Sequence, residues 1–341
     1  MEVSLYKNID DKIMCTACLR YCRLSDGQTG YCGVRANVNG HLNLSVYNMP
    51  YSFNIDPIEK KPVLHMYPGA DILSFGTTGC NFGCLYCQNY DMSQRRKADG
   101  VYYTPEDVVN LAMEYNTDGI AYTYNEPTIF MEYARDIGLI ARRHGLINIF
   151  VTNGYETDES MKMASEFLDA MTVDFKGNGN KYFYNKYISV PSAEGIFNTI
   201  KNAVNYGIHT EITDLIIPDI GDSLDDARKM LEKIMNIAGP YIPVSFLRYH
   251  PDYKLNIPET PLNTLIAHHD LAVSMGFKYV YLGNVHEVNY ENTYCPVCHN
   301  LLISRRGFYS RVTGLDSNGR CKNCGYITGI KLLRNKKLIK G

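Results

Sequence analysis

Between residues 71 and 285, short runs of β-branched and aromatic residues alternate with longer segments whose apolar residues recur at helical spacing. The short runs predict seven strands, at residues 71–78, 119–124, 148–153, 170–176, 210–217, 243–249 and 278–285. The longer segments predict helices, among them 105–114, 127–144, 222–238 and 262–275. Strands that alternate with helices are typical of a parallel sheet built from βαβ units. We therefore expect an α/β fold with a partial or near-complete TIM-like (β/α) barrel.

Polar or conformationally special residues follow the predicted strands. They are Thr77 to Cys80, Asn125 to Pro127, Thr152 to Gly154, Asp174 to Lys176, Pro218 with Asp219, and Gly283 with Asn284. A (β/α) barrel carries its chemistry at the C-terminal ends of its strands, so these endings predict one shared site. An open doubly wound sheet uses the same edge, but it normally has a phosphate-binding glycine motif, and neither GxGxxG nor GxxxxGK[ST] occurs.

The segments on either side of the predicted barrel have a different character. Residues 1–70 contain a cysteine group and a β-rich stretch with a turn at Asn39 and Gly40. Residues 289–341 contain another cysteine group and a basic tail. We expect three regions: an N-terminal metal-binding region with four cysteines (1–70), a (β/α) barrel (71–288), and a C-terminal zinc-ribbon-like module with four cysteines and the basic tail (289–341).

The overall composition narrows the class of protein. Hydrophobic residues make up 45% of the 341 residues and charged residues 21%, which is ordinary globular usage. The formal net charge of -2 gives the whole molecule no field that would gather nucleic acid. The chain has no apolar run long enough to cross a membrane, and its polar start lacks the apolar core of a secretory signal. We expect a cytoplasmic protein without membrane contact.

All 11 cysteines fall into three tight groups, and this count carries the most information. The groups are Cys15, Cys18, Cys22 and Cys32; Cys80, Cys84 and Cys87; and Cys295, Cys298, Cys321 and Cys324. In a reducing compartment disulfides are disfavoured, and such short spacings suit an ion or a cluster. Two groups can complete a four-thiolate shell, whereas the middle group lacks a fourth ligand. An incomplete shell indicates a site of chemistry.

The middle group has the spacing C-x3-C-x2-C directly after the first barrel strand. Such a loop can place three thiolates around one [4Fe-4S] cubane and leave the fourth iron for an outside ligand. Zinc in an incomplete knuckle is the alternative, but no histidine lies close after Cys87 to complete its shell.

This motif, with Tyr86 before its last cysteine, resembles the signature of the radical S-adenosylmethionine (SAM) superfamily. The stretches DPIEKKP (56–62), CQN (87–89) and YTYNEPT (122–128), with the C-terminal cysteine module, resemble the radical SAM protein of the AmmeMemoRadiSam system. That family is related to pyruvate formate-lyase activating enzymes, and the resemblance covers nearly the whole chain. It implies an enzyme whose [4Fe-4S] cluster reductively cleaves SAM to a 5′-deoxyadenosyl radical. The radical would abstract hydrogen from an unidentified substrate, such as a protein glycyl site, a nucleotide or a small molecule.

The resemblance also implies site residues. Cys80, Cys84 and Cys87 would ligate three irons and carry catalysis, while the amino and carboxylate groups of SAM bind the fourth. The implied or candidate SAM contacts are Tyr86, Glu126, Asn153, Asp174, Lys176, Ile217 and His250. Simple structural interpretations compete with them. The stretch from Asn125 to Pro127 can cap a helix, Asp174 and Lys176 can form an ion pair, and Ile217 fits an apolar strand.

The two four-cysteine groups have their own alternatives. The C-terminal group is typical of the two knuckles of a zinc ribbon, although a single iron would satisfy the same spacing. The N-terminal group suits a structural zinc or an auxiliary iron–sulfur cluster. The segment from Arg305 to Gly341 contains ten Lys or Arg residues and one acidic residue, Asp316. Such a run is more often a solvated face than a nucleic-acid contact, and it lacks aromatic platforms for single strands.

An enzyme of this kind is expected to be oxygen-sensitive and to need a flavodoxin-type or ferredoxin-type reductant. Two other classes remain open from sequence. One is a metal-binding module that binds nucleic acid or a partner protein, with an inert barrel. The other is an iron–sulfur electron-transfer protein that does not respond to SAM.

Overall fold

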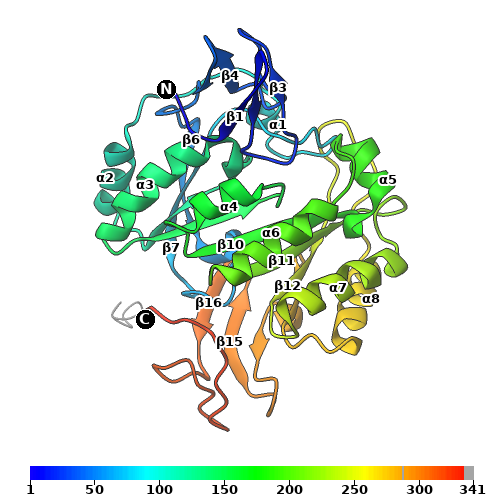
Figure 1. Ribbon diagram of the computed structural model, residues 1–341. Coiled ribbons are helices and arrows are strands. Elements are labelled where there is room, and N and C mark those ends of the chain that lie inside the picture. The colour runs from blue at the N-terminus through cyan, green and yellow to red at the C-terminus, as the bar shows by residue number, and fades with distance from the viewer. Residues whose placement is uncertain (286–287, 334–341) are drawn as a thin grey trace.

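The computed structural model describes residues 1–285 and 288–333 (Figure 1). Its centre is an eight-stranded sheet in the order β13-β12-β11-β10-β9-β8-β7-β6. These strands are β6 (Ser52–Pro57), β7 (Asp71–Gly76), β8 (Gly119–Tyr122), β9 (Ile147–Thr152), β10 (Ala170–Lys176), β11 (His209–Ile216), β12 (Val244–Arg248) and β13 (Val280–Gly283). From β7 to β13 every neighbouring pair is parallel, while β6 runs antiparallel to β7.

The sheet confirms the predicted fold class as a partial barrel. All seven predicted strands form, each within a few residues of its expected bounds. The edges of the sheet are β6 and β13, so the barrel is open on one side. The β6 strand comes from the segment expected to belong to the N-terminal region, and its six residue pairs with β7 extend the sheet by one antiparallel strand.

The helices lie along the outer face of the sheet, where Figure 1 shows α3, α4, α6 and α7 one after another. Their bounds are α1 (Tyr90–Ser93), α2 (Pro105–Glu114), α3 (Met131–Arg143), α4 (Asp158–Ala164), α5 (Lys181–Phe183), α6 (Glu194–Asn205), α7 (Leu224–Ala238) and α8 (Leu262–Ser274). The predicted helices correspond to α2, α3, α7 and α8. The 3-10 turn η2 (Pro127–Phe130) precedes α3 and takes up the start of the predicted 127–144 segment.

Local sequence explains where these helices begin and which face they bury. The side chain of Thr104 accepts a hydrogen bond from the amide of Asp107, whose carboxylate accepts the Thr104 amide in return. This capping box, followed by Pro105, starts α2. In α3, residues three or four positions apart, such as Ala134, Ile137 and Ala141, are fully buried against the sheet.

The other elements are short. They are η1 (Ile58–Lys60), η3 (Gly177–Gly179), the π-helical turn η4 (Tyr184–Ile188) and η5 (Val288–Tyr290). The N-terminal strands are β1 (Tyr6–Ile9), β2 (Lys12–Cys15), β3 (Arg23–Leu24), β4 (Arg35–Val38) and β5 (His41–Leu44). The turn between β4 and β5 has positive φ at both Asn39 and Gly40, as the sequence predicts for a tight hairpin.

The two cysteine-rich ends lie on opposite sides of the central sheet (Figure 1). The C-terminal strands are β14 (Thr293–Tyr294), β15 (Leu301–Arg306) and β16 (Tyr309–Val312), which form a separate antiparallel sheet. Most of the predicted basic tail, residues 334–341, lies outside the described residues. Within the described chain, none of the helices has the length and apolar composition needed to cross a lipid bilayer.

Candidate active site and metal centres

The C-x3-C-x2-C loop begins a few residues after β7 and is held by backbone contacts. The amide of Gly83 donates to the carbonyl of Ile188 (2.8 Å), and the amide of Leu85 donates to that of Tyr187 (3.0 Å). Both carbonyls belong to the π-helical turn η4. A Cβ atom on Gly83 would lie 2.5 Å from the hydroxyl of Tyr31, so a larger residue at this position would require the Tyr31 side chain to move.

This loop forms one wall of a cavity of about 530 Å³. The cavity is also lined by residues at the C-terminal ends of the strands, as the sequence predicts for a barrel. The structure brings the following predicted site residues together around it: Cys80, Cys84, Tyr86, Cys87, Asn153, Asp174, Lys176 and His250. Two other predicted contacts, Glu126 and Ile217, are fully buried and do not belong to its lining.

The three cysteines lie where bare thiols would stay protonated. Burial raises the pKa of Cys80 well above its usual range, and it raises that of Cys84 to about 12. Lys176 is the nearby cation. Its burial favours the neutral amine, but the charge of Asp174, together with Cys84 and Cys87 in their deprotonated form, outweighs burial and raises the pKa of Lys176. A metal centre would displace the thiol protons, and Lys176 would then face negative sulfur.

Lys176 and Asp174 both line the cavity from the end of β10. The Lys176 ammonium lies 3.6 Å from the Asp174 carboxylate, which also accepts a hydrogen bond from the hydroxyl of Thr213. Residues two apart on a strand share a face, and this places both side chains toward the cavity. The arrangement offers one cation and one anion to a zwitterionic ligand.

Asn153 connects the end of β9 to the cysteine loop. Its side-chain amide donates to Oδ1 of Asn81 (2.7 Å), and its backbone amide donates to Oε2 of Glu126 (2.8 Å). Tyr86 packs against the rings of Phe183 and Tyr249, at centroid distances of 5.8 and 6.4 Å.

The remaining predicted contacts lie at the margins of the site. His250 is exposed at the cavity rim, where its ring hydrogen-bonds the Gln88 side chain next to Cys87. Ile217 is buried beyond the end of β11, and its backbone pairs with Gly221. Leu215, two residues earlier, contributes to the cavity wall instead.

Glu126 is paired with a second carboxylate that sequence reasoning missed, Glu156. The hydroxyls of Thr128 and Thr152 each lie within hydrogen-bond distance of Oε1 of both glutamates, at 2.5 to 2.9 Å. Burial, reinforced by the neighbouring Glu156, raises the pKa of Glu126 from 4.5 to about 8. Burial also raises the pKa of Glu156. The pair therefore retains a proton at neutral pH.

A second missed cluster lies where the DPIEKKP and YTYNEPT stretches meet. The Lys61 ammonium lies 2.6 Å from the Asp56 carboxylate, which also accepts a hydrogen bond from the Tyr124 hydroxyl (2.7 Å). Lys61 and Tyr124 line the cavity. Burial lowers the pKa of Lys61 to about 8, against the opposing effect of Asp56. The two stretches marked these residues as unusual, but only the fold places them at the site.

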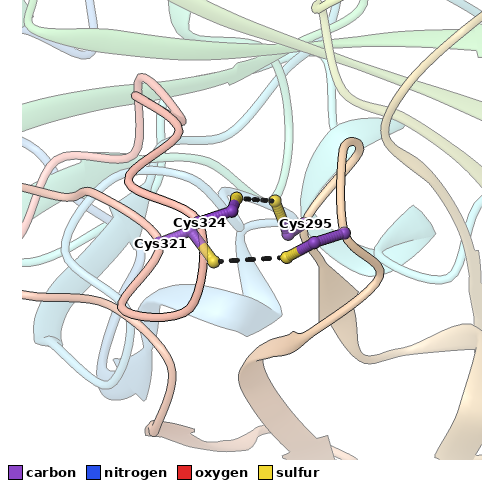
Figure 2. A group of neighbouring side chains, drawn as sticks. Cys295, Cys321 and Cys324 are labelled. Carbon is purple, nitrogen blue, oxygen red and sulfur yellow. Dashed lines mark hydrogen bonds between the residues drawn. The ribbon is translucent and has the colours of Figure 1, made fainter.

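The C-terminal cysteines form a compact tetrad, part of which Figure 2 labels. Sγ of Cys295 lies 3.6 Å from Sγ of Cys324, and Sγ of Cys298 lies 3.7 Å from Sγ of Cys321. All four sulfurs lie within 4.8 Å of one another. Four thiolates around one ion at about 2.3 Å would be separated by about 3.8 Å. This group can therefore hold a single metal ion.

The N-terminal cysteines gather differently. Cys15, Cys18, Cys22 and Cys32 line one small cavity of about 10 Å³, next to the cysteine loop residue Asn81. Among the described residues, the C-terminal tetrad is the one group of three or more Cys, His, Asp or Glu whose ligand atoms all lie within 4.8 Å.

Comparisons with known proteins agree with this architecture. Residues 75–234 match the family model of the radical SAM superfamily. In fold, the chain is similar to a radical SAM methyltransferase from Sphaerobacter thermophilus, with a TM-score of 0.51 and 13% identity over 69% of this chain and 71% of that one.

Two sequence relatives place the chain more closely. An uncharacterized protein of Methanocaldococcus jannaschii is 42% identical over 329 residues, which cover 95% of this chain and 97% of the relative. The pyruvate formate-lyase-activating enzyme of Clostridium pasteurianum is 25% identical over 197 residues, 52% of this chain and 79% of that enzyme. This chain belongs to the radical SAM superfamily and is an enzyme related to pyruvate formate-lyase activating enzymes.

Proposed function

We propose that Cys80, Cys84 and Cys87 hold a [4Fe-4S] cluster and that the chain uses it to cleave SAM reductively. The observation that carries this proposal is the 530 Å³ cavity in which the three thiols meet polar groups from the strand ends. The donor set suits such a cluster, since three thiolates leave one iron for a ligand from outside the protein. The superfamily match over the same loop supports it.

The chain's own residues bind and orient SAM. Lys176 would bind the methionine carboxylate, and Asp174 would accept a hydrogen bond from the ribose or the ammonium group. Asn153 lines the same wall and would contact the ribose. Tyr86 and Leu215 would contact the adenine. The side chain of Glu126 lies outside the cavity lining, but its carboxylate accepts a hydrogen bond from the backbone amide of Asn153. Glu126 would therefore act on the ammonium group of SAM indirectly, by positioning Asn153.

When bound, the reduced cluster supplies one electron to SAM, which gives methionine and a 5′-deoxyadenosyl radical that removes a hydrogen atom from the substrate. Half of the residues that line the cavity are buried, and these would limit the access of water to the radical. His250, at the rim, would contact the incoming substrate or move a proton there.

We propose a glycyl residue of a partner protein as the substrate. The support is the similarity to an enzyme named for activating pyruvate formate-lyase. Hydrogen abstraction would convert the glycine to a glycyl radical, with 5′-deoxyadenosine as the second product. The electron would come from a ferredoxin-type or flavodoxin-type reductant in the cytoplasm.

At the C-terminal tetrad we propose zinc. Sulfur separations of 3.6 and 3.7 Å suit the tetrahedral shell of a closed structural zinc site. The module buries a small core of its own around Cys295 and Cys321. Metal binding would therefore supply a large part of its folding free energy.

The proposal is tested with the full chain, purified without oxygen and reconstituted with iron and sulfide. Dithionite and SAM should give 5′-deoxyadenosine, and SAM should change the electron paramagnetic resonance (EPR) signal of the reduced cluster. Cys84→Ala should abolish both. A chain with intact iron and sulfide whose EPR signal ignores SAM would instead be an electron-transfer protein.

The substrate is tested by isotope transfer. Candidate partner proteins would be labelled with deuterium at glycine Cα and mixed with the reduced enzyme and SAM. Deuterium in 5′-deoxyadenosine identifies a glycyl substrate. Deoxyadenosine that forms without deuterium from any labelled partner would exclude those partners.

A further inference from the structure

We propose that Phe308, in the C-terminal hairpin between β15 and β16, determines substrate specificity by binding an apolar side chain next to the reacting glycine of the partner protein. The inference rests on the glycyl substrate of the proposed function. It gives the C-terminal module a part in substrate recognition, in addition to holding a metal ion.

The hairpin holds Phe308 in a tight turn. Arg306, which ends β15, pairs with Tyr309, which begins β16, so the loop between the strands consists of Gly307 and Phe308. Gly307 has a φ of 59°, and glycine at the first position of a two-residue loop is typical of a type II′ turn. The amide of Gly307 also donates to Oε2 of Glu291 (3.0 Å). The backbone at Phe308 therefore has little freedom.

Arg305 anchors this hairpin to both edges of the open barrel. Its buried guanidinium donates to the carbonyl of Leu64 (2.7 Å), in the segment that joins β6 to β7. It also donates to the hydroxyl of Thr293 (2.6 Å), which lies 2.8 Å from the hydroxyl of Tyr281 on β13. Because β6 and β13 are the edges of the sheet, the module bridges the side on which the barrel is open.

The hairpin faces the residues proposed to bind SAM. Asp174 and Lys176 lie on β10, one of the two central strands in the order of the sheet. A sheet that curves toward closure places its central strands opposite the gap between its edges. Arg305, Gly307 and Phe308 line the same cavity as Asp174 and Lys176. A substrate held beside SAM would therefore contact the hairpin on its other side.

The ring of Phe308 is available to such a substrate. Phe308 lines the cavity although it is 47% exposed, so it lies where the cavity meets solvent. Leu64 and Tyr281, which lie beside the Arg305 anchor, also line the cavity. An exposed aromatic ring next to apolar wall residues favours an apolar side chain, because contact removes apolar surface from water on both sides. Tyr309 is 87% exposed and does not belong to the lining.

The charged residues that precede Leu64 in the cavity wall already have partners. Lys60 and Lys61 both form ion pairs with Asp56. The carboxylate of Glu59 accepts a hydrogen bond from the amide of Gly69 (2.9 Å). These partners offset the charge of this part of the wall, which leaves an aromatic ring as the contact that the hairpin offers.

The first test uses the absence of tryptophan from the chain. Phe308→Trp introduces one indole at the proposed contact, and Tyr309→Trp is the matched control. Each full chain is reconstituted without oxygen, supplied with SAM but no reductant, and titrated with acetyl-Leu-Gly-Leu-amide. The emission of Phe308→Trp should move to shorter wavelength as the peptide covers the indole, while that of the control stays unchanged. No shift in Phe308→Trp, or the same shift in both, overturns the proposal.

The second test measures hydrogen transfer from two peptides, acetyl-Leu-Gly-Leu-amide and acetyl-Ser-Gly-Ser-amide, with deuterium at the glycine Cα. In kcat/KM for labelled 5′-deoxyadenosine, the unmodified chain should prefer the leucine peptide about tenfold. Phe308→Ala should lower this preference to less than about threefold, whereas Tyr309→Ala should keep it. An unmodified chain without preference, or a Phe308→Ala chain that keeps it, overturns the proposal.

These outcomes are separable from those of the proposed function. If the reduced, unmodified chain forms no 5′-deoxyadenosine from SAM, the proposed cleavage fails. If it forms 5′-deoxyadenosine that neither peptide labels, the glycyl substrate is refuted. The emission test needs no turnover, so it decides in either case whether Phe308 binds an apolar side chain.

Discussion

Replacing Glu156 by glutamine should make the stability of the protein less dependent on pH. Glu126 and Glu156 are both buried and share the hydroxyls of Thr128 and Thr152. The pKa of Glu126 is raised from 4.5 to about 8, so the folded chain binds a proton that the unfolded chain has lost. Stability is then greatest at low pH and falls as the pH rises from the ordinary carboxyl range through about 8.

The size of the effect follows from these two pKa values. At about 1.4 kcal/mol for each pKa unit, the full rise of the Glu126 pKa corresponds to at most roughly 5 kcal/mol. Between pH 6.5 and pH 8.5 the linkage predicts a loss of about 2 kcal/mol in the free energy of unfolding. Burial is the larger cause of the shift and Glu156 the second. Glu156→Gln should therefore reduce this loss to less than about 1 kcal/mol.

The assay is urea unfolding of the reconstituted chain without oxygen, at pH 6.5 and at pH 8.5, followed by circular dichroism. Glu114→Gln is the matched control, because Glu114 is an exposed residue at the end of α2. The control should follow the unmodified chain at both pH values. If Glu156→Gln loses as much stability as the control between the two pH values, the two carboxylates do not share a proton and the reasoning is wrong.

Three further predictions concern the metal sites. Gly79→Ala should lower the unfolding midpoint and the cluster iron content more than Gly27→Ala does, because both glycines have positive φ but only at Gly79 does a Cβ meet a carbonyl, that of Cys32. Lys176→Met should weaken SAM binding about tenfold in calorimetry, the effect of losing one charge-assisted hydrogen bond, while the EPR signal without SAM stays unchanged. Cys298→Ser should release the C-terminal ion and lower the melting temperature, and metal analysis should find the cluster iron retained.

The sequence predicted the barrel well because its strands carry the signal locally. Each of the seven runs is rich in β-branched or aromatic residues, and each becomes a strand between β7 and β13. The β6 strand was missed. Its sequence, SFNIDP, ends in proline and contains few apolar residues. An antiparallel edge strand of this kind forms because the backbone of β7 offers it hydrogen-bond partners. The residues of β6 themselves carry no pattern that reveals this pairing.

The site was predicted in part for the same reason. Cysteine spacing is local, so the loop from Cys80 to Cys87 and the C-terminal group could be found in the sequence. The partners of Glu126 and Asp56 could not, since Glu156 lies 30 residues beyond Glu126 and Tyr124 lies 68 residues beyond Asp56. Only the folded chain brings such pairs together. The hydrogen bonds between the cysteine loop and η4 are also non-local, and they could not be predicted because they use backbone carbonyls, which no pattern of side chains marks.

The contacts of the N-terminal region fix it against the barrel, beside the cysteine loop. Arg35 and Glu132, on α3, form an ion pair in which both side chains are almost fully buried, and Arg35 also donates to the carbonyl of Ile129 (2.7 Å). Breaking a buried pair by removing one partner costs about 3–5 kcal/mol, so this contact resists separation of the region from the barrel. The backbone of the Cys32 loop meanwhile occupies the space beside Gly79. These contacts hold the N-terminal region in a fixed position against the loop that carries Cys80, Cys84 and Cys87.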